Sequence, residues 1–362
     1  MGTVADIGAR YRDTGARHWC CPGGARHWCC PGAGLLPCQT PVLPVPGTRA
    51  ACRLATRVDS SRFQTMARPL RFIPPGSVVE VTSRTVGSRF LLRPGPAANS
   101  LIVGVLGRAQ SLFGVRVFAV AVMSNHIHAL LGVDHAAHLA TFMQYALGNI
   151  AKELARHHKW KGPFWGRRYR SIVVADDASQ VARLRYVLCQ GIKERLIARA
   201  AQWPGVSSFA TLARGMPMRG IWRSRTDEEQ SKEKEYELKH TRLPALSHKT
   251  EDDHKAYVET IVRAEEDEAQ AERRRAASKK GVLGSRRILA QDPHSAPEES
   301  SHGPAPLVHA ASASMRAAFR DAYRAFVSAF KAAAESLRAN LPADFPEGSF
   351  PPGSPFIKPQ SA

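Results

Sequence analysis

Two histidines have a spacing that could support metal chemistry. His126 and His128 are separated by one residue within a mostly apolar run that we expect to form a β-strand. Side chains two positions apart on a strand lie on the same face of the sheet, so both imidazoles could bind one divalent cation. The H-x-H pattern alone is weak, because a strand with one packed and one solvated histidine would look the same.

A tyrosine and a glutamine provide the second candidate pair. Tyr186 and Gln190 lie four residues apart in a segment that we expect to be helical, and residues with this spacing share a helix face. If this helix crosses the sheet, Gln190 could be a third ligand and Tyr186 would point at the metal-bound group. An amide oxygen with two imidazoles suits Mg²⁺ or Mn²⁺ with positions left open for a phosphate. The alternative is that Tyr186 is an ordinary core residue.

Positive charge and aromatic residues point to nucleic acid. The chain carries 51 basic and 31 acidic residues, a net charge of +20, and residues 66–215 hold 20 of the basic and 6 of the acidic ones. Such an excess is typical of a domain with a polyanionic partner. Within this stretch the sequence FWGRRYR at 164–170 interleaves rings with guanidinium groups, the combination used for unpaired nucleic acid, although a loop with a few salt bridges remains the alternative.

No segment suits a membrane or secretion. The longest apolar run, Val117 to Met123, is far shorter than the roughly 20 residues of a membrane-spanning helix. The first 30 residues also lack the apolar core of a secretory signal. We therefore expect a protein of the cytoplasm that does not contact membranes.

The elements that must position these residues follow one another in a regular order. Apolar patterning predicts strand, helix, strand, strand, helix, strand and helix within residues 66–215. This order is typical of a ferredoxin-like, split βαβ sandwich of the α+β class. The expected strands are 77–84, 115–123, 126–133 and 171–174. The expected helices are 97–113, 139–158 and one that starts after Asp176-Asp177 and carries Val181 to Leu196.

The flanks have a different composition. Residues 1–65 hold six of the seven cysteines and an identical tandem repeat, GARHWCCPG, so we expect either a disordered leader or an error in the gene model, with translation starting at Met66. After the patterned domain at 66–215 we expect a helical C-terminal extension. Its expected parts are a charged, partly helical segment at 216–290, a linker at 291–314, an amphipathic helix at 315–341 and a Pro-rich tail at 342–362.

Residues 66–215 resemble the IS200-like single-tyrosine transposases, and within them the REP-associated tyrosine transposases of bacteria. The matching segments occur in the family's order and spacing over about 145 residues. They are MARPLRF at 66–72, EVTSR at 80–84, FGVRVFAVAVMSNHIHALLGV at 113–133, FWGRRYR at 164–170, RYVLCQGIKERL at 185–196 and WPGVSSF at 203–209.

The resemblance implies an HUH endonuclease fold with a divalent metal, Mg²⁺ or Mn²⁺. It implies that His126 and His128 are metal ligands, that Tyr186 is the nucleophile and that Gln190 is the third ligand. Many REP-associated members have Asn-Pro where this chain has Gln190-Gly191, so the third ligand departs from their pattern.

The activity implied is cleavage and rejoining of single-stranded DNA, folded as a hairpin, through a 5′-phosphotyrosine intermediate. Our candidates for contacts to the DNA backbone are Arg167, Arg168, Arg170 and Lys193. The resemblance places a monomer or homodimer on the bacterial nucleoid. The alternative is a domesticated, non-catalytic nucleic-acid-binding protein on the same fold. The sequences around the histidines and Tyr186 resemble those of transposases more than those of replication initiators or relaxases. A simple metallohydrolase would not need Tyr186.

Overall fold

The computed structural model describes residues 69–224, 233–276, 281–298 and 305–350. The chain divides into two units, Met1–Met66 and Ala67–Ala362, and every described residue belongs to the second unit. The predicted leader and the end of the predicted Pro-rich tail, residues 351–362, lie outside the described residues.

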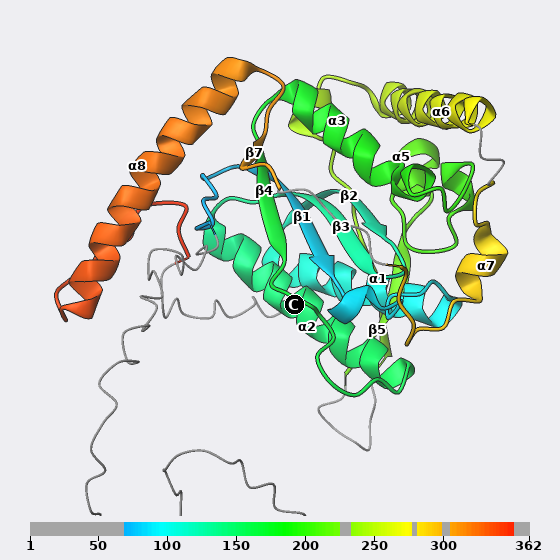
Figure 1. The fold of residues 1–362 in the computed structure, drawn as a ribbon, viewed down its shortest axis with the longest axis horizontal. Coiled ribbons are helices and arrows are strands. Elements are labelled where there is room, and N and C mark those ends of the chain that lie inside the picture. Colours follow the sequence, from blue (N-terminus) through cyan, green and yellow to red (C-terminus); the bar gives the residue numbers. More distant parts are fainter. Residues whose placement is uncertain (1–68, 225–232, 277–280, 299–304, 351–362) are drawn as a thin grey trace, which may run out of the picture. The chain divides into compact units, whose positions relative to one another are not determined.

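A five-stranded sheet forms the centre of the second unit, in the order β2-β3-β1-β4-β7 (Figure 1). Strand β1 is antiparallel to its neighbours β3 and β4, β2 is antiparallel to β3, and β7 runs parallel to β4. Each of the two βαβ crossovers therefore encloses one antiparallel strand, which confirms the predicted split βαβ arrangement of the α+β class. The strands are β1 Val78–Arg84, β2 Arg116–Val122, β3 His126–Gly132, β4 Arg170–Val174 and β7 Val308–His309.

Helices cover both faces of the sheet. In Figure 1 helices α1 (Pro96–Phe113) and α2 (Ala136–His157) lie on one face, and helix α3 (Asp177–Leu188) lies on the other. An apolar core lies on each face, because successive side chains of β1 point to opposite sides of the sheet. Val79 and Val81 pack with the side chains of α1 and α2, whereas Val78 packs with those of α3.

The helix expected to run to Leu196 is interrupted, so that expectation is wrong in its second half. Helix α3 ends at Leu188, Cys189 has φ −100° and ψ 13°, and a short helix α4 (Gln190–Lys193) follows. The backbone N–H groups of Leu196 and Ile197 then both donate to the carbonyl of Gly191, which turns the chain back. This turn buries Ile192 and Ile197 in the core beneath α3. The free energy gained by burying these two side chains exceeds what the hydrogen bonds of a continued helix would contribute.

The C-terminal extension packs against the central sheet and its helices. The segment 216–290, expected to be charged and partly helical, contains a β-hairpin on α1 as well as helices, and the segment 291–314, expected to be a linker, contains β7. The remaining elements are α5 Phe209–Arg214, β5 Arg219–Arg223, β6 Glu233–Glu237, α6 Glu251–Arg275, α7 Ser285–Leu289 and α8 Ala313–Arg338, together with 3₁₀ turns at Val86–Ser88, Ala200–Gln202 and Pro244–Leu246.

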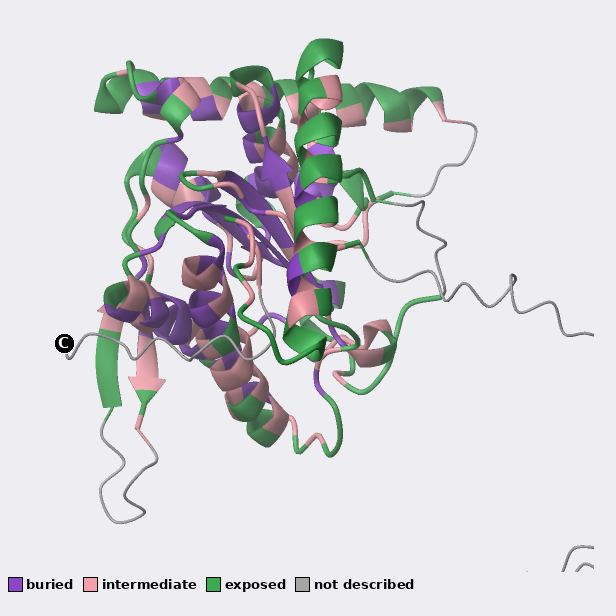
Figure 2. Cartoon of the chain, turned by 90° about the vertical axis from the view of Figure 1, so that its left-hand side faces the viewer, coloured by how far each residue is buried: buried purple, intermediate pink, exposed green. Residues whose placement is uncertain are grey.

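Helix α8 lies against the start of the described chain. Phe72 stacks on Phe326 with ring centroids 4.6 Å apart and also meets Phe319 at 5.6 Å, while the Tyr323 hydroxyl donates to the Leu70 carbonyl. The rest of α8 is mostly exposed, as Figure 2 shows. None of the helices in the described ranges combines the length and hydrophobicity that a membrane span requires.

The contact between α1 and β5 depends on glycine. A Cβ added to Gly104 would lie 2.3 Å from the backbone carbon of Ile221, so we expect Gly104→Ala to destabilise the fold by about 1–3 kcal/mol. Gly148, in helix α2, has nothing within 4 Å of an added Cβ, and Gly148→Ala should stabilise by about 0.5–1 kcal/mol. Denaturant unfolding of both variants checks this, and equal effects of the two substitutions would contradict the close packing.

A histidine on the loop after β6 makes stability depend on pH. Burial lowers the pKa of His240 from 6.5 to about 4, and its ring accepts or donates a hydrogen bond with Ser208. Between these pH values only the unfolded chain takes up the proton, so the free energy of unfolding should fall as pH drops from about 6.5 to about 4, by at most about 3 kcal/mol for this group.

The pKa of His158 is also lowered to about 4, so His158 contributes a pH dependence of the same sign. A His240→Gln variant keeps His158, and its difference from the wild type therefore measures the contribution of His240. Denaturant unfolding at pH 7.0 and pH 4.5 should show a smaller loss of stability in the variant. Identical losses in both proteins would mean that His240 titrates normally in the folded state.

Candidate functional site

The two histidines of β3 lie side by side on the face covered by α3 and α4. Their ring centroids are 5.0 Å apart, and the exposed fractions are 1% for His126 and 5% for His128. Because both are buried, the alternative of one packed and one solvated histidine does not hold.

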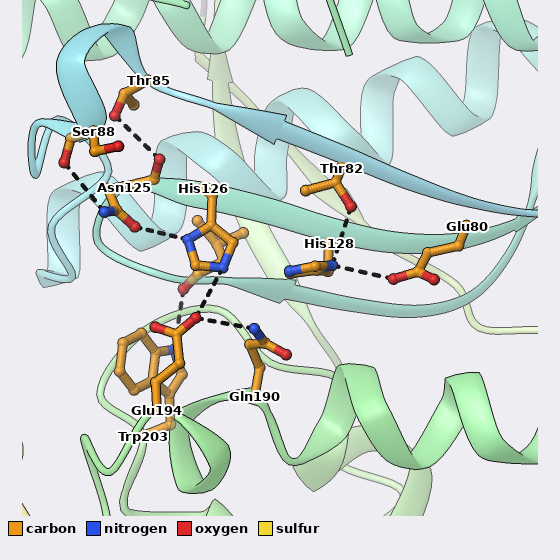
Figure 3. A network of polar contacts seen from close by, with 11 residues as sticks. Glu80, Thr82, Thr85, Ser88, Asn125, His126, His128, Gln190, Glu194 and Trp203 are labelled. Atoms are coloured by element: carbon orange, nitrogen blue, oxygen red, sulfur yellow. Dashed lines mark hydrogen bonds and ion pairs between the residues drawn. The ribbon is translucent and has the colours of Figure 1, made fainter. Parts of the chain in front are cut away.

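Each imidazole is held through its Nδ1 atom. Nδ1 of His126 lies 2.7 Å from the side-chain oxygen of Asn125, whose amide nitrogen donates to the Ser88 carbonyl. Nδ1 of His128 lies 3.2 Å from the Thr82 hydroxyl and 3.3 Å from a Glu80 oxygen. In Figure 3 the other nitrogen of each ring is turned away from these partners. Such outer contacts fix the tautomer and orientation of a ligating imidazole.

Tyr186 and Gln190 approach the histidines from the helical side. The half-buried Tyr186 ring packs on the core beneath α3, and its centroid lies 5.3 Å from that of His128. Gln190 is the first residue of α4 and is 4% exposed, and its amide nitrogen donates to Glu194 at 3.0 Å. The Gln190 oxygen is buried without a hydrogen-bond partner in the described part of the chain. The structure thus brings the four predicted residues together despite the break at Cys189.

Glu194 is a member of this group that our sequence analysis missed. Its carboxylate lies between α4 and β3, with one oxygen 3.5 Å from Nε2 of His126 and accepting from Gln190 (Figure 3). The signal in the sequence was the regular spacing of Tyr186, Gln190 and Glu194, each four residues after the last.

A second missed residue, Glu80, lies behind His128. This carboxylate is 4% exposed, and Arg183 of α3 approaches both of its oxygens, at 2.9 Å and 2.7 Å. Nε2 of His309 lies 2.9 Å from one of them. Burial alone would raise the pKa of Glu80, but the contacts of its carboxylate with His128 and His309 and the charge of Arg183 hold it well below its usual value. Glu80 is therefore ionised although it is buried.

Two cations lie near the Tyr186 ring. The Arg183 guanidinium carbon lies 3.7 Å from the ring centroid, and the Lys193 ammonium lies 5.6 Å from it. Lys193 also forms an ion pair of 3.0 Å with Glu265 of helix α6. Both cations therefore lie beside the Tyr186 ring while each also pairs with a carboxylate, Arg183 with Glu80 and Lys193 with Glu265.

The segment at 164–170 divides into packed rings and exposed charges. Phe164 is buried, the Trp165 indole donates to the Leu147 carbonyl, and the Tyr169 ring lies under the guanidinium of Arg71, 3.9 Å from centroid to carbon. These rings serve the packing of the fold and do not form the stacking surface that the pattern suggested.

The basic side chains of this segment are exposed instead. Arg167, Arg168 and Arg170 are all exposed. Arg170 pairs with Thr82 across β1 and β4, and Thr82 pairs with His128, so Arg170 lies on the face of the sheet that carries the histidines. The strand register thus places Arg170 on this face, and for Arg167 and Arg168 the structure shows exposure alone.

No group of three or more His, Cys, Asp or Glu side chains in the described ranges is arranged to hold a metal ion. A cation here would therefore need an additional donor of another kind, and the amide of Gln190 is the one within the cluster.

A comparison with protein families tests the predicted resemblance to the IS200-like transposases. Residues 100–190 match the family model described as "Transposase IS200 like". The predicted resemblance to the IS200-like transposases is confirmed over this stretch. The match contains the two histidines, Tyr186 and Gln190. No curated protein matches the sequence.

Solved structures with local similarity include two transposases and one enzyme of another kind. A REP-associated tyrosine transposase bound to a REP hairpin is 16% identical over 40% of this chain and 83% of its own, with a TM-score of 0.32. A candidate transposase from Deinococcus radiodurans R1 is 20% identical over 30% and 87%, with a TM-score of 0.25. A bacterial tRNA(His) guanylyltransferase-like protein in complex with GTP is 15% identical over 56% and 97%, with a TM-score of 0.28. None of these scores reaches 0.5, so the fold is argued from the strand order.

Proposed function

We propose that this protein is a metal-dependent transposase and endonuclease that cleaves and rejoins single-stranded DNA through a 5′-phosphotyrosine intermediate. The observation that carries the proposal is the position of the Tyr186 ring, 5.3 Å from His128, on the face where the rings of His126 and His128 lie 5.0 Å apart. A simple hydrolase or a non-catalytic binding protein would not require a tyrosine at this position. The family match over the same residues supports the proposal.

The residues present fit a divalent cation. Two imidazoles share one face, and the Gln190 oxygen is a buried acceptor without a partner in the described ranges. In our proposal His126, His128 and Gln190 hold Mg²⁺ or Mn²⁺, and the amide oxygen of Gln190 is the donor that completes the two imidazoles. Bound there, the ion would neutralise charge on the scissile phosphate.

The protein's own residues perform the covalent step. The Tyr186 oxygen attacks phosphorus while its proton leaves to solvent, and the cations of Arg183 and Lys193 lie beside its ring. The bond from phosphorus to the 3′ oxygen breaks, and that oxygen leaves as a protonated hydroxyl. The bond energy is kept in the phosphotyrosine, so a second 3′-hydroxyl can attack phosphorus and release Tyr186 without ATP.

The proposed substrate is single-stranded DNA folded as a hairpin. We assign phosphate contacts to the exposed Arg167, Arg168 and Arg170 and to Lys193, whose ammonium lies 5.6 Å from the Tyr186 ring centroid. This activity would place the protein on the bacterial nucleoid as a monomer or homodimer.

Removing one oxygen atom tests the nucleophile. The full-length protein with Mn²⁺ and labelled oligonucleotides that tile the DNA flanking its gene should form a covalent adduct on a denaturing gel. Tyr186→Phe should abolish the adduct and leave the DNA dissociation constant within about twofold, because the ring and its packing remain. Tyr257→Phe, on α6, is the matched control and should behave like the wild type.

An adduct that persists in Tyr186→Phe would assign the nucleophile elsewhere. DNA binding by the wild type with no adduct on any tiled oligonucleotide would favour the non-catalytic alternative.

The salt dependence of binding tests the arginines. Each lost phosphate contact should reduce the slope of log K against log salt by about 0.7 for single-stranded DNA. We expect a decrease of about 1.4 for the double variant Arg167→Gln/Arg168→Gln. Arg324→Gln, an exposed site on α8, should leave the slope unchanged. An unchanged slope in the double variant would remove these arginines from the interface.

A further inference from the structure

The residues behind the candidate site form a connected polar group that the family match does not account for. We propose that Glu80 is the positioning residue of this site, and that His309 from the C-terminal extension completes it by holding the Glu80 carboxylate. This inference rests on the proposed function, because it concerns the same histidine and the same tyrosine.

Glu80 is placed at the centre of the sheet. It lies on β1, between β3 and β4, two residues before Thr82, which pairs with His128. The pleat therefore directs Glu80 and Thr82 to the face that carries the histidines. A buried carboxylate is costly unless it is paired, so its three partners must be arranged around it when the chain folds.

On one side Glu80 acts on a proposed metal ligand. One of its oxygens lies 3.3 Å from Nδ1 of His128. A carboxylate at this distance keeps the proton on Nδ1 and leaves the Nε2 lone pair free for a metal. Thr82 contacts the same nitrogen at 3.2 Å, but a hydroxyl can either donate or accept, so only Glu80 selects the tautomer.

On the other side Glu80 acts on the proposed nucleophile. Arg183 approaches both carboxylate oxygens, and the same guanidinium lies 3.7 Å from the Tyr186 ring centroid. The carboxylate fixes the guanidinium, and the guanidinium fixes one face of the ring. One side chain thus sets the orientation of His128 and of Tyr186 relative to each other.

His309 reaches this group from the distant end of the sequence. It pairs with Val174 in the parallel ladder of β4 and β7, and its carbonyl accepts from Ala175. Its Nε2 lies 2.9 Å from the Glu80 oxygen that faces Nε of Arg183. His309 lies outside residues 100–190, so the extension supplies a residue that the matched family segment lacks.

The entry into helix α8 holds β7 in place. Asp176 caps the start of α3 by accepting from Ser179, and its other oxygen accepts from the backbone N–H groups of Ala311 and Ser312. The segment after β7 is therefore tied to the helix that carries Tyr186 and Arg183. This connection gives the extension a role in the site and not only in the stability of the fold.

Two readouts on the full-length protein test the inference. The affinity for Mn²⁺ is measured by electron paramagnetic resonance, and the rate of adduct formation is measured at saturating Mn²⁺. We expect Glu80→Gln to weaken Mn²⁺ binding about 10- to 100-fold and to slow adduct formation. His309→Ala should act in the same direction by a smaller factor, and His309→Gln, which retains a donor, should recover most of the loss. His248→Ala, at an exposed position, is the control and should match the wild type.

A double variant separates action through Glu80 from an independent effect. In the Glu80→Gln background, His309→Ala should add nothing further to either readout. Since Glu80→Gln leaves the charge of the partly buried Arg183 without its carboxylate partner, circular dichroism checks the fold. The double variant Glu80→Gln/Arg183→Met replaces the single variant if that one unfolds.

Wild-type Mn²⁺ affinity and adduct rate in folded Glu80→Gln and His309→Ala would overturn this inference and leave the proposed function intact. Additive losses in the double variant would overturn the part assigned to His309. A wild type that neither binds Mn²⁺ nor forms the adduct would instead mean that the proposed function has failed.

Discussion

Burying the Glu80 carboxylate between three strands would cost several kcal/mol if it lacked partners. The structure meets this constraint with Arg183 from α3, His128 from β3 and His309 from β7, all within 3.3 Å of its oxygens. These contacts join elements that are far apart in the sequence, and a shift of α3 would remove the Arg183 contact while a shift of β7 would remove the His309 contact. A buried ion pair adds little net stability, but it selects one arrangement of the elements around it.

The two faces of the sheet differ in character, because one is packed with apolar side chains and the other carries the polar candidate site. The face under α1 and α2 is packed with apolar side chains, among them Val79 and Val81 of β1. The opposite face carries Glu80 and Thr82 on the same strand, beside His126 and His128. A strand with period two can present both patterns at once, so the apolar core on one face supports a polar site on the other.

The sequence predicted strands β1 to β4 and helices α1 and α2 to within a few residues, because their apolar periods are local signals. The common face of His126 and His128 followed from the same period. The prediction that Tyr186 and Gln190 share a face rested on their spacing of four residues. They still lie on one side of the chain, because the backbone leaves the helical conformation only at Cys189.

Contacts between distant segments could not be predicted in this way. Strand β7 is two residues long and lies within a Pro- and Ser-rich stretch, so neither its pairing with β4 nor the contact between His309 and Glu80 has a local signal. The aromatic rings at 164–170 were misinterpreted for the same reason, because the composition gave no indication that Phe164 would be buried. In both cases the contact joins residues that are distant in the sequence, so no local pattern indicates which residues meet.

The central claim is that both histidines bind one cation beside Tyr186. Pulsed electron paramagnetic resonance of the Mn²⁺-loaded protein, with histidine labelled by ¹⁵N, measures it most directly. The account predicts couplings from two imidazole nitrogens, with one lost in His126→Ala and one lost in His128→Ala. A manganese ion coupled to water alone, or unchanged by both substitutions, would contradict it.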